Sequence, residues 1–223
     1  MLERELLDWL KIKNLDVILK SHSKYFRNIL LKAFDLKKEQ EILIITDWGS
    51  YNKRVAAIMA GCYAVAAEKS GFKTKIVMQK PKDRLEAAEN HVVDALYKQK
   101  PKSMIIMCLS NRPGSLAPVI GKSYRRFVQQ RKHNFVSTTG LGDLESKDIY
   151  IITRALDVDY RSLRQRASKI KKIFDNGREI KIKTEAGTDL AASIVGMKSI
   201  SNDGNYKGDV LGGNIPVGEV YIP

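Results

Sequence analysis

The sequence predicts an α/β protein: an N-terminal domain with a parallel β-sheet and flanking helices, followed by the β-rich start of a second domain. Three short, continuously apolar runs alternate with helical patterns in the first half of the chain, which is typical of parallel strands buried on both faces. From residue 179 onward, apolar and polar side chains alternate instead, as in antiparallel strands joined by turns. The Asn176-Gly177 pair ends the preceding helical pattern, so we predict two domains, residues 1–177 and 178–223.

The predicted elements of the first domain alternate between helices and strands. In chain order within each kind, they are helices over residues 2–19, 23–37, 52–70, 84–99 and 159–175, and strands over residues 41–46, 73–78, 103–109 and 149–152. The helices are assigned from apolar residues at 3.6-residue spacing, and the strands from short apolar, β-branched runs. Gly71 follows the Ala-rich third helix at a capping position. The strand, helix, strand order implies right-handed crossovers and hence a parallel sheet.

The segment from Glu179 predicts a β-hairpin. Ile180 and Ile182 alternate with lysines, Gly187 lies at the turn, and Leu190 begins the same alternation on the return strand. About forty-five residues are near the limit below which a domain needs help to be stable. We therefore expect this segment to pack on the first domain, to pair with another chain, or to belong to something longer.

Polar residues follow two of the predicted strands, at the edge where the carboxyl ends of parallel strands form a crevice. Asp47 and Ser50 follow the first strand, and Ser110 and Arg112 follow the third. We interpret Asp47 and Ser50 as caps of the helix that begins near Asn52. Arg112 could instead bind a substrate carboxylate or pair with an acidic neighbour.

Several other polar segments are interpreted as turns. The segment Gly140–Asp143 lacks the spacing and the Lys-Ser/Thr pair of a phosphate-binding loop. Asp189 is expected to close the hairpin turn through hydrogen bonds of its own side chain, and Asp203 and Asp209 are expected to be turn residues.

Composition indicates a globular protein. The chain has 43% hydrophobic and 29% charged residues, which disfavours disorder. No apolar run approaches the ~20 residues that cross a bilayer, and the N-terminus lacks a signal-peptide core. We therefore expect a cytoplasmic protein with no membrane association. Cys62 and Cys108 lie in apolar patterns, which favours buried, reduced thiols over a disulfide.

The formal net charge of +14 raises the question of nucleic-acid binding. Lysine and arginine cluster over residues 122–132 and 161–172. In the second cluster an apolar stripe at helical spacing would leave the basic side chains as a solvated face; the stripe consists of Leu163, Ala167, Ile170 and Phe174. No RNA-binding signature or zinc-finger spacing is present in the sequence. We therefore do not expect nucleic acid as a partner.

Glu219 is the candidate metal ligand of this chain. It lies between Gly218 and Val220, after a cluster of Gly, Asn and Pro that exposes backbone and forms turns. A carboxylate held at the lip of a rigid turn suits a divalent cation, which needs hard or borderline ligands on a preorganised frame.

Three short runs carry a family resemblance: Gly187-Thr188-Asp189-Leu190, Asp203-Gly204, and Asn214-Ile215-Pro216-Val217-Gly218-Glu219-Val220. Together they resemble the aminopeptidase T/aminopeptidase S family of metallopeptidases, in which an N-[LI]-P-x-G-E run supplies the first metal-ligating glutamate. The resemblance maps that role onto Glu219. It implies a two-metal exopeptidase that takes peptide substrates, uses Zn, Co or Mn ions and forms dimers.

One departure from the family pattern limits this function. The family takes its remaining ligands and catalytic groups from a long segment after the first glutamate, and this chain ends four residues after Glu219. The three histidines, His22, His91 and His133, all lie upstream. A two-metal site needs several protein ligands. We therefore expect an N-terminal portion of a metalloaminopeptidase, inactive by itself and with unknown catalytic residues, or a naturally short relative that lost catalysis.

Two alternatives remain open. The first is a related non-haem metal enzyme on the same scaffold, such as a ring-cleaving iron dioxygenase of the 2,5-dihydroxypyridine type, which resembles this peptidase family in sequence. A histidine and carboxylate pattern would separate it from the peptidase. The second is a non-catalytic binding or structural protein. A homodimer is expected because the family forms dimers and because the β-rich end looks incomplete.

Overall fold

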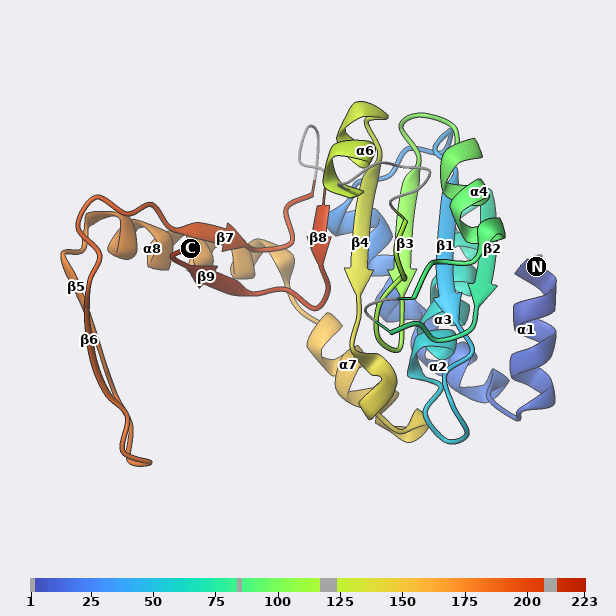
Figure 1. Cartoon of the computed structure of the whole chain (residues 1–223), viewed down its shortest axis with the longest axis horizontal. Helices are drawn as coiled ribbons and strands as arrows, with labels where there is room; N and C mark the ends of the chain where they lie inside the picture. The colour runs from blue at the N-terminus through green and yellow to red at the C-terminus, as the bar shows by residue number, and fades with distance from the viewer. Residues whose placement is uncertain (1–2, 84–85, 117–123, 207–211) are drawn as a thin grey trace. The chain divides into compact units, whose positions relative to one another are not determined.

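The computed structural model describes residues 3–83, 86–116, 124–206 and 212–223 (Figure 1). The predicted α/β class with a parallel sheet is confirmed. Five strands form one sheet in the order β2-β1-β3-β4-β8, and every neighbouring pair is parallel. Their bounds are β1 Ile42–Asp47, β2 Thr74–Gln79, β3 Met104–Cys108, β4 Asn134–Thr138 and β8 Gly212–Asn214. Most of these strands are short apolar runs buried on both faces, as expected for a sheet covered by helices.

Helices connect and cover these strands. Their bounds are α1 Glu3–Ile12, α2 Asp16–Asn28, α3 Val55–Lys69, α4 Asn90–Lys98, α6 Tyr124–Gln130, α7 Ile149–Leu156 and α8 Tyr160–Asn176. The helical pattern over residues 2–19, which allows one helix or a pair, forms two helices, because Asn14 with φ of 58° ends the first. The helix expected from residue 23 begins at Asp16 and continues into a π-helical turn at Ile29–Ala33. None of the helices in the described ranges combines the length and the apolar character needed to cross a membrane.

Contacts divide the chain into two compact units. We call Met1–Asp157 together with Tyr206–Pro216 the α/β unit, and Val158–Asn205 together with Val217–Pro223 the small unit. The boundary expected at residue 177 lies after α8, whereas the contacts group α8 with the later strands, because α8 packs on β7 and β9.

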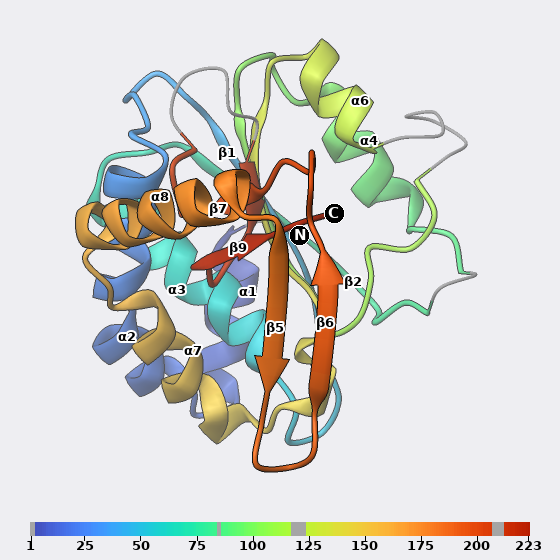
Figure 2. The same cartoon turned by 90° about the vertical axis from the view of Figure 1, so that its left-hand side faces the viewer.

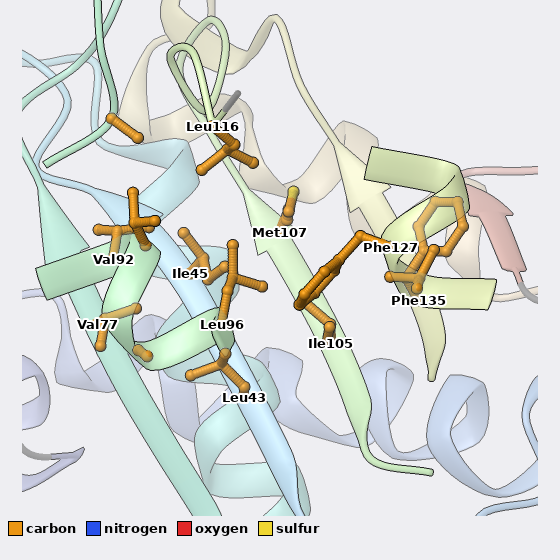
Figure 3. Packing of buried hydrophobic residues seen from close by; sticks show 14 of the residues in the cluster. Leu43, Ile45, Val77, Val92, Leu96, Ile105, Met107, Leu116, Phe127 and Phe135 are labelled. Atoms are coloured by element: carbon orange, nitrogen blue, oxygen red, sulfur yellow. The ribbon is translucent and has the colours of Figure 1, made fainter. Parts of the chain in front are cut away.

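The core of the α/β unit lies on both faces of its sheet. On one face, α4 and α6 cover alternate residues of β1, β2, β3 and β4 (Figure 3), including Leu43, Ile45, Val77, Ile105, Met107 and Phe135. On the other face lies α3, which is buried over most of its length. Helices α1 and α2 pack closely on α3, since a Cβ at Gly61 would lie 2.6 Å from Leu10 and 2.9 Å from Leu19. The buried apolar area on both faces stabilises the sheet.

Two strands of this sheet were absent from the sequence prediction. The segment NFVST forms β4, directly after the basic helix α6. β8 is only three residues long and begins with Gly212, whose φ is 132° and whose added Cβ would lie 1.7 Å from the carbonyl oxygen of Phe135. Only glycine allows this approach of two backbones.

The strand predicted over residues 149–152 is wrong, because this run begins helix α7. The buried residues of α7 lie at positions i, i+3, i+4 and i+7, which is helical spacing: Ile149, Ile152, Thr153 and Leu156. A four-residue apolar run does not distinguish a buried strand from a buried helical turn by periodicity.

Tyr206 and residues 212–216 are held in the α/β unit by specific contacts. The Tyr206 ring stacks on Phe34 with centroids 4.9 Å apart, and the Tyr206 hydroxyl donates to the carbonyl oxygen of Asn214 at 3.0 Å. The Thr138 hydroxyl donates to the carbonyl oxygen of Ile215 at 2.8 Å. Together with the pairing of β8 with β4, these bonds hold residues 212–216 at the edge of β4. Asp209, an expected turn residue, lies outside the described residues.

The small unit contains α8 and two antiparallel strand pairs, β5–β6 and β7–β9. Their bounds are β5 Glu179–Lys183, β6 Asp189–Ser193, β7 Ile200–Asn202 and β9 Glu219–Tyr221. The predicted hairpin is confirmed as β5–β6 (Figure 2). Its apolar face carries Ile182 and Leu190, which are 45% and 49% exposed. On α8, Ala167 is buried but Ile170 is exposed, so the predicted apolar stripe is covered only in part.

A polar cluster joins α8 to the start of β7. The backbone N–H and the hydroxyl of Ser199 both donate to Asp175 Oδ1, at 2.8 and 2.7 Å. Lys171 Nζ donates to Asp175 Oδ2 at 3.0 Å and also to the carbonyl oxygen of Ser199. These hydrogen bonds, first those from Ser199 and then that from Lys171, hold the pKa of Asp175 well below its usual range.

We expect Ser199→Ala to destabilise the small unit by about 1–2 kcal/mol, because the variant loses one hydrogen bond to a carboxylate in a buried position. Hydrogen exchange of the β7 and β9 backbone amides measures the effect locally. Ser193→Ala, on an exposed position of β6, is the matched control. Equal exchange rates in the two variants would contradict a stabilising role for this cluster.

Both cysteines have the state expected from the sequence. Cys62 and Cys108 are free and buried, and burial raises the pKa of each thiol well above its usual value. They are therefore unreactive core residues.

Candidate functional site

Asp47 organises the edge of the sheet where β1 and β3 end. Its carboxylate is completely buried. Oδ2 accepts a hydrogen bond from the backbone N–H of Ser110 at 2.7 Å, and Oδ1 accepts from the Ser110 hydroxyl at 2.5 Å and from the backbone N–H of Gly49 at 2.9 Å. Asp47 therefore ties the carboxyl ends of two adjacent strands together.

The predicted capping role of Asp47 and Ser50 is wrong. Helix α3 begins at Val55, after Arg54 at the N-cap position, and the backbone N–H of Arg54 donates to the Ser146 hydroxyl at 3.1 Å. The backbone N–H of Ser50 pairs with the carbonyl oxygen of Lys53 in a tight turn. The helix thus starts later than expected, and the buried carboxylate is used between strands instead.

The turn after β1 requires a glycine. Gly49 has φ of 63°, and an added Cβ would lie 2.1 Å from the carbonyl oxygen of Lys53. No residue with a side chain fits at this position without a shift of the backbone. The position of Ser50 therefore depends on Gly49.

A cleft of about 380 Å³ opens beside this turn. Its lining residues follow four strands of the sheet: Gly49 and Ser50 after β1, Pro81 after β2, Ser110 and Asn111 after β3, and Gly140, Gly142 and Asp143 after β4. The chain leaves β1 toward β2 on one side and leaves β3 toward β4 on the other. The connections therefore diverge between β1 and β3, which is the switch point at which α/β sheets bind ligands.

The rim of the cleft is held by polar contacts of the loops after β2 and β3. Gln79 is buried and donates through Nε2 to the carbonyl oxygen of Pro113 at 2.9 Å. Glu89 accepts from the backbone N–H of Lys80 at 2.9 Å and pairs with Lys82 at 3.4 Å. The hydrogen bond from Lys80 is the main cause of the lowered pKa of Glu89. Arg112, for which carboxylate binding and an acidic partner were both open, is exposed and is not among the residues that line the cleft.

The loop after β4 is a turn, as predicted. Leu141–Asp143 forms a short 3₁₀ turn that follows Gly140, whose φ is 75°. The backbone N–H of Gly140 donates to the carbonyl oxygen of Asn111, and that of Gly142 donates to the carbonyl oxygen of Ser110. The loop is thereby bonded to the end of β3.

Glu219 lies in the small unit, at the first position of β9. It is exposed and lies opposite Asn202 of β7 in the antiparallel pair. The side-chain amide of Asn202 donates to Glu219 Oε1 at 3.0 Å, and the backbone N–H of Gly218 donates to the carbonyl oxygen of Asn202 at 2.9 Å. The strand pair therefore fixes the backbone that carries this carboxylate.

The two other predicted turn aspartates have different roles. Asp203 accepts from the backbone N–H of Asn205 and from the Ser201 hydroxyl, at 3.1 and 3.2 Å, which confirms its turn role. The turn role of Asp189 is wrong, because its carboxylate pairs with Lys183 across the hairpin at 3.1 Å. The Thr184 hydroxyl closes that turn instead, by accepting from the backbone N–H of Thr188.

The residues present do not fit a complete metal centre. Within the described ranges, no group of three or more His, Cys, Asp or Glu residues is placed to hold a metal ion. His91 contacts the carbonyl oxygen of Met78, and His133 is buried in the core. Glu219 is thus a single carboxylate, whereas a structural or catalytic metal in a protein takes three or more ligands.

The fold and its cleft define an α/β protein with a ligand crevice at the switch point of a parallel sheet. No protein-family model matches the sequence, and no curated protein is similar to it. The structure is similar to that of 2,5-dihydroxypyridine dioxygenase from Pseudomonas putida KT2440, with a TM-score of 0.60 and 10% sequence identity. The similar region covers 92% of this chain and 56% of that enzyme. At this identity the similarity shows a shared fold alone.

These comparisons correct the predicted family. The identification with aminopeptidase T and aminopeptidase S is wrong, and so are the peptidase and hydrolase activities that it implied: the structural neighbour is a dioxygenase, and no peptidase family matches. The sequence runs that carried this resemblance are explained by the backbone conformation of their glycines. Gly187, Gly204 and Gly218 all have positive φ, so the backbone conformation favours glycine at these positions, whatever the activity.

Proposed function

We propose that this chain is the scaffold of a metal-dependent oxygenase related to the ring-cleaving dioxygenases, and that Glu219 is the carboxylate it contributes to the metal. The observation that carries this proposal is the extent of the structural similarity. It covers 92% of the chain, which is a larger share than the α/β unit alone makes up. Because one fold hosts many functions, the substrate is not inferred from it.

The surroundings of Glu219 support its role as a ligand. The carboxylate is exposed, and its hydrogen-bonding partner is the neutral amide of Asn202. It therefore has lone pairs available for a cation on a backbone that a strand pair holds in place. Non-haem iron oxygenases combine one carboxylate with two histidines. Residues 1–2, 84–85, 117–123 and 207–211 include no histidine, so in our proposal the two histidines come from another polypeptide segment.

Binding of Mn²⁺ tests the role of Glu219 without any assay of activity. We expect the paramagnetic ion to broaden the backbone NMR signals of β9, with the largest effect at Glu219 and Val220, because the ion would lie at this carboxylate. Glu219→Gln should abolish the local broadening. Glu179→Gln, the same chemical change on exposed β5 of the same unit, should leave it unchanged. Broadening that survives in Glu219→Gln would exclude Glu219 as the ligand.

The oxygenase class has a separate test, which needs the natural assembly that contains the remaining ligands. We expect this assembly, isolated from its source cells, to take up O₂ when Fe²⁺ and a dihydroxylated aromatic probe such as 2,5-dihydroxypyridine are added, and Glu219→Gln in this chain to abolish the uptake. Uptake that is unchanged in Glu219→Gln would reject Glu219 as a ligand, and an assembly that takes up no O₂ would reject the oxygenase proposal. The homodimer also remains a prediction, with which the exposed apolar face of the β5–β6 hairpin agrees.

A further inference from the structure

The glycine-rich lining of the cleft is not an anion site. Phosphate-binding loops use free backbone N–H groups, but here these groups donate within the protein. The pairs, each given as donor and acceptor residue, are Gly49 to Asp47, Ser50 to Lys53, Ser110 to Asp47, Gly140 to Asn111 and Gly142 to Ser110. A phosphate or carboxylate in the cleft would therefore meet few donors.

Asp47 determines what Ser110 offers to a ligand. A hydroxyl has one hydrogen, and that of Ser110 is donated to the buried Asp47 at 2.5 Å. The lone pairs of the Ser110 hydroxyl oxygen remain available to accept a hydrogen bond from a ligand in the cleft. Ser110 is thus fixed as an acceptor.

Two further side chains add acceptors. The side-chain amide of Asn111 donates one of its two hydrogens to Asp83 Oδ1 at 3.2 Å, and its oxygen adds an acceptor. Asp143 is exposed and lines the cleft with a carboxylate. The lining is therefore rich in acceptors and carries one negative charge, although the protein as a whole is strongly basic.

We propose that the cleft binds a hydroxylated primary amine of monosaccharide size, that is, a ligand of the amino-sugar class. Hydroxyl groups of such a ligand would donate to Ser110 and Asn111, and its ammonium group would donate to Asp143 in a charge-assisted hydrogen bond. A volume of about 380 Å³ accommodates a molecule of this size. The site lies wholly in the α/β unit and does not depend on the proposed metal role of Glu219.

Tryptophan fluorescence offers a direct measurement of ligand binding in the cleft. Both tryptophans of the chain, Trp9 and Trp48, contact each other with ring centroids 4.9 Å apart, and Trp48 directly precedes the lining residue Gly49. Calorimetry is run in parallel, because binding that leaves the tryptophans undisturbed still exchanges heat. The probes are glucosamine, N-acetylglucosamine without the positive charge, and glucose 6-phosphate.

We expect glucosamine to bind saturably, N-acetylglucosamine to bind about tenfold more weakly, and glucose 6-phosphate to bind no better than N-acetylglucosamine. Asp143→Asn should weaken glucosamine binding about tenfold and leave N-acetylglucosamine unaffected, because only the ammonium group uses the charge. Asp94→Asn, the same change on an exposed position of α4, should change neither affinity.

Three results would overturn the proposal: no saturation by glucosamine up to about 50 mM, beyond which any binding is weak; tighter binding of glucose 6-phosphate than of glucosamine; or an unchanged glucosamine affinity in Asp143→Asn. Far-UV circular dichroism confirms that the variant is folded, as expected for a substitution of an exposed side chain.

Discussion

Replacing Asp47 with alanine is expected to lower the free energy of unfolding of the α/β unit by about 3–5 kcal/mol. The substitution removes the acceptor of three hydrogen bonds at once, from the backbone N–H groups of Gly49 and Ser110 and from the Ser110 hydroxyl. Buried donors without partners each cost about 1–3 kcal/mol, and part of that cost is recovered when water enters the space. The loss should also separate the ends of β1 and β3, and with them the cleft.

Urea unfolding followed by tryptophan fluorescence measures this loss. The signal reports on the α/β unit specifically, because both tryptophans lie in it. Asp47→Asn should cost less, about 2 kcal/mol, since the amide keeps one acceptor oxygen but turns its NH₂ group toward a donor. Asp94→Asn, on the exposed face of α4, should be close to wild type. A loss below about 1 kcal/mol for Asp47→Ala would show that this carboxylate does not hold the strands together.

Acid is expected to destabilise the same unit through His133. The ring is completely buried, and neither ring nitrogen has a hydrogen-bond partner among the residues that the structure describes. Burial, and secondarily the charge of Arg131, lowers the pKa of His133 from 6.5 to about 4. The neutral ring is therefore the form that fits the fold.

The sign of the pH effect follows from this pKa difference. Above pH 6.5 His133 is neutral in both the folded and the unfolded chain, so it does not affect stability. Between pH 6.5 and about 4 the unfolded chain binds a proton that the folded chain does not, so the free energy of unfolding decreases as the pH falls. This difference in the pKa of His133 between the unfolded and the folded chain lowers the free energy of unfolding by about 3 kcal/mol over the whole interval.

His133→Leu isolates this contribution from that of the carboxylates, which titrate in the same range. Urea unfolding of the wild type and the variant at pH 7 and near pH 4.5 yields one stability difference for each protein. We expect the wild-type difference to exceed that of the variant by about 2 kcal/mol. Equal differences would show that His133 is charged or solvated in the folded state.

Local sequence patterns predicted the parts of the fold that depend on local structure. The strands β1, β2 and β3 and helix α3 were found where apolar runs and 3.6-residue spacing placed them, and the β5–β6 hairpin was found from alternation and a turn glycine. The patterns failed where a short run allows two structures. Residues 149–152 have the composition of a strand but form the first turn of α7, because their apolar side chains meet α2 and α3 there.

The candidate site was predicted less completely, because its contacts join residues distant in the chain. Asp47 and Ser110 were each noticed at a strand end, but their hydrogen bonds span 63 positions, and the local alternative of helix capping was chosen. Asp143 was interpreted only as part of a turn. For β8 the sequence offers only Gly212 itself as a signal, since a glycine in a strand often marks a close backbone approach, and its neighbour Phe135 became known only from the structure.

The sequence by itself determined the class of the fold, the reduced state of the two cysteines and the presence of a candidate carboxylate at Glu219. The tertiary structure decided which strands are neighbours, where the cleft opens and which of its polar groups remain available to a ligand. The physical reason is that periodicity records only whether each side chain is buried. The pairing of β1 with β3, and the hydrogen bonds that consume the donors of the glycine-rich lining, depend on segments that meet only after the sheet has formed.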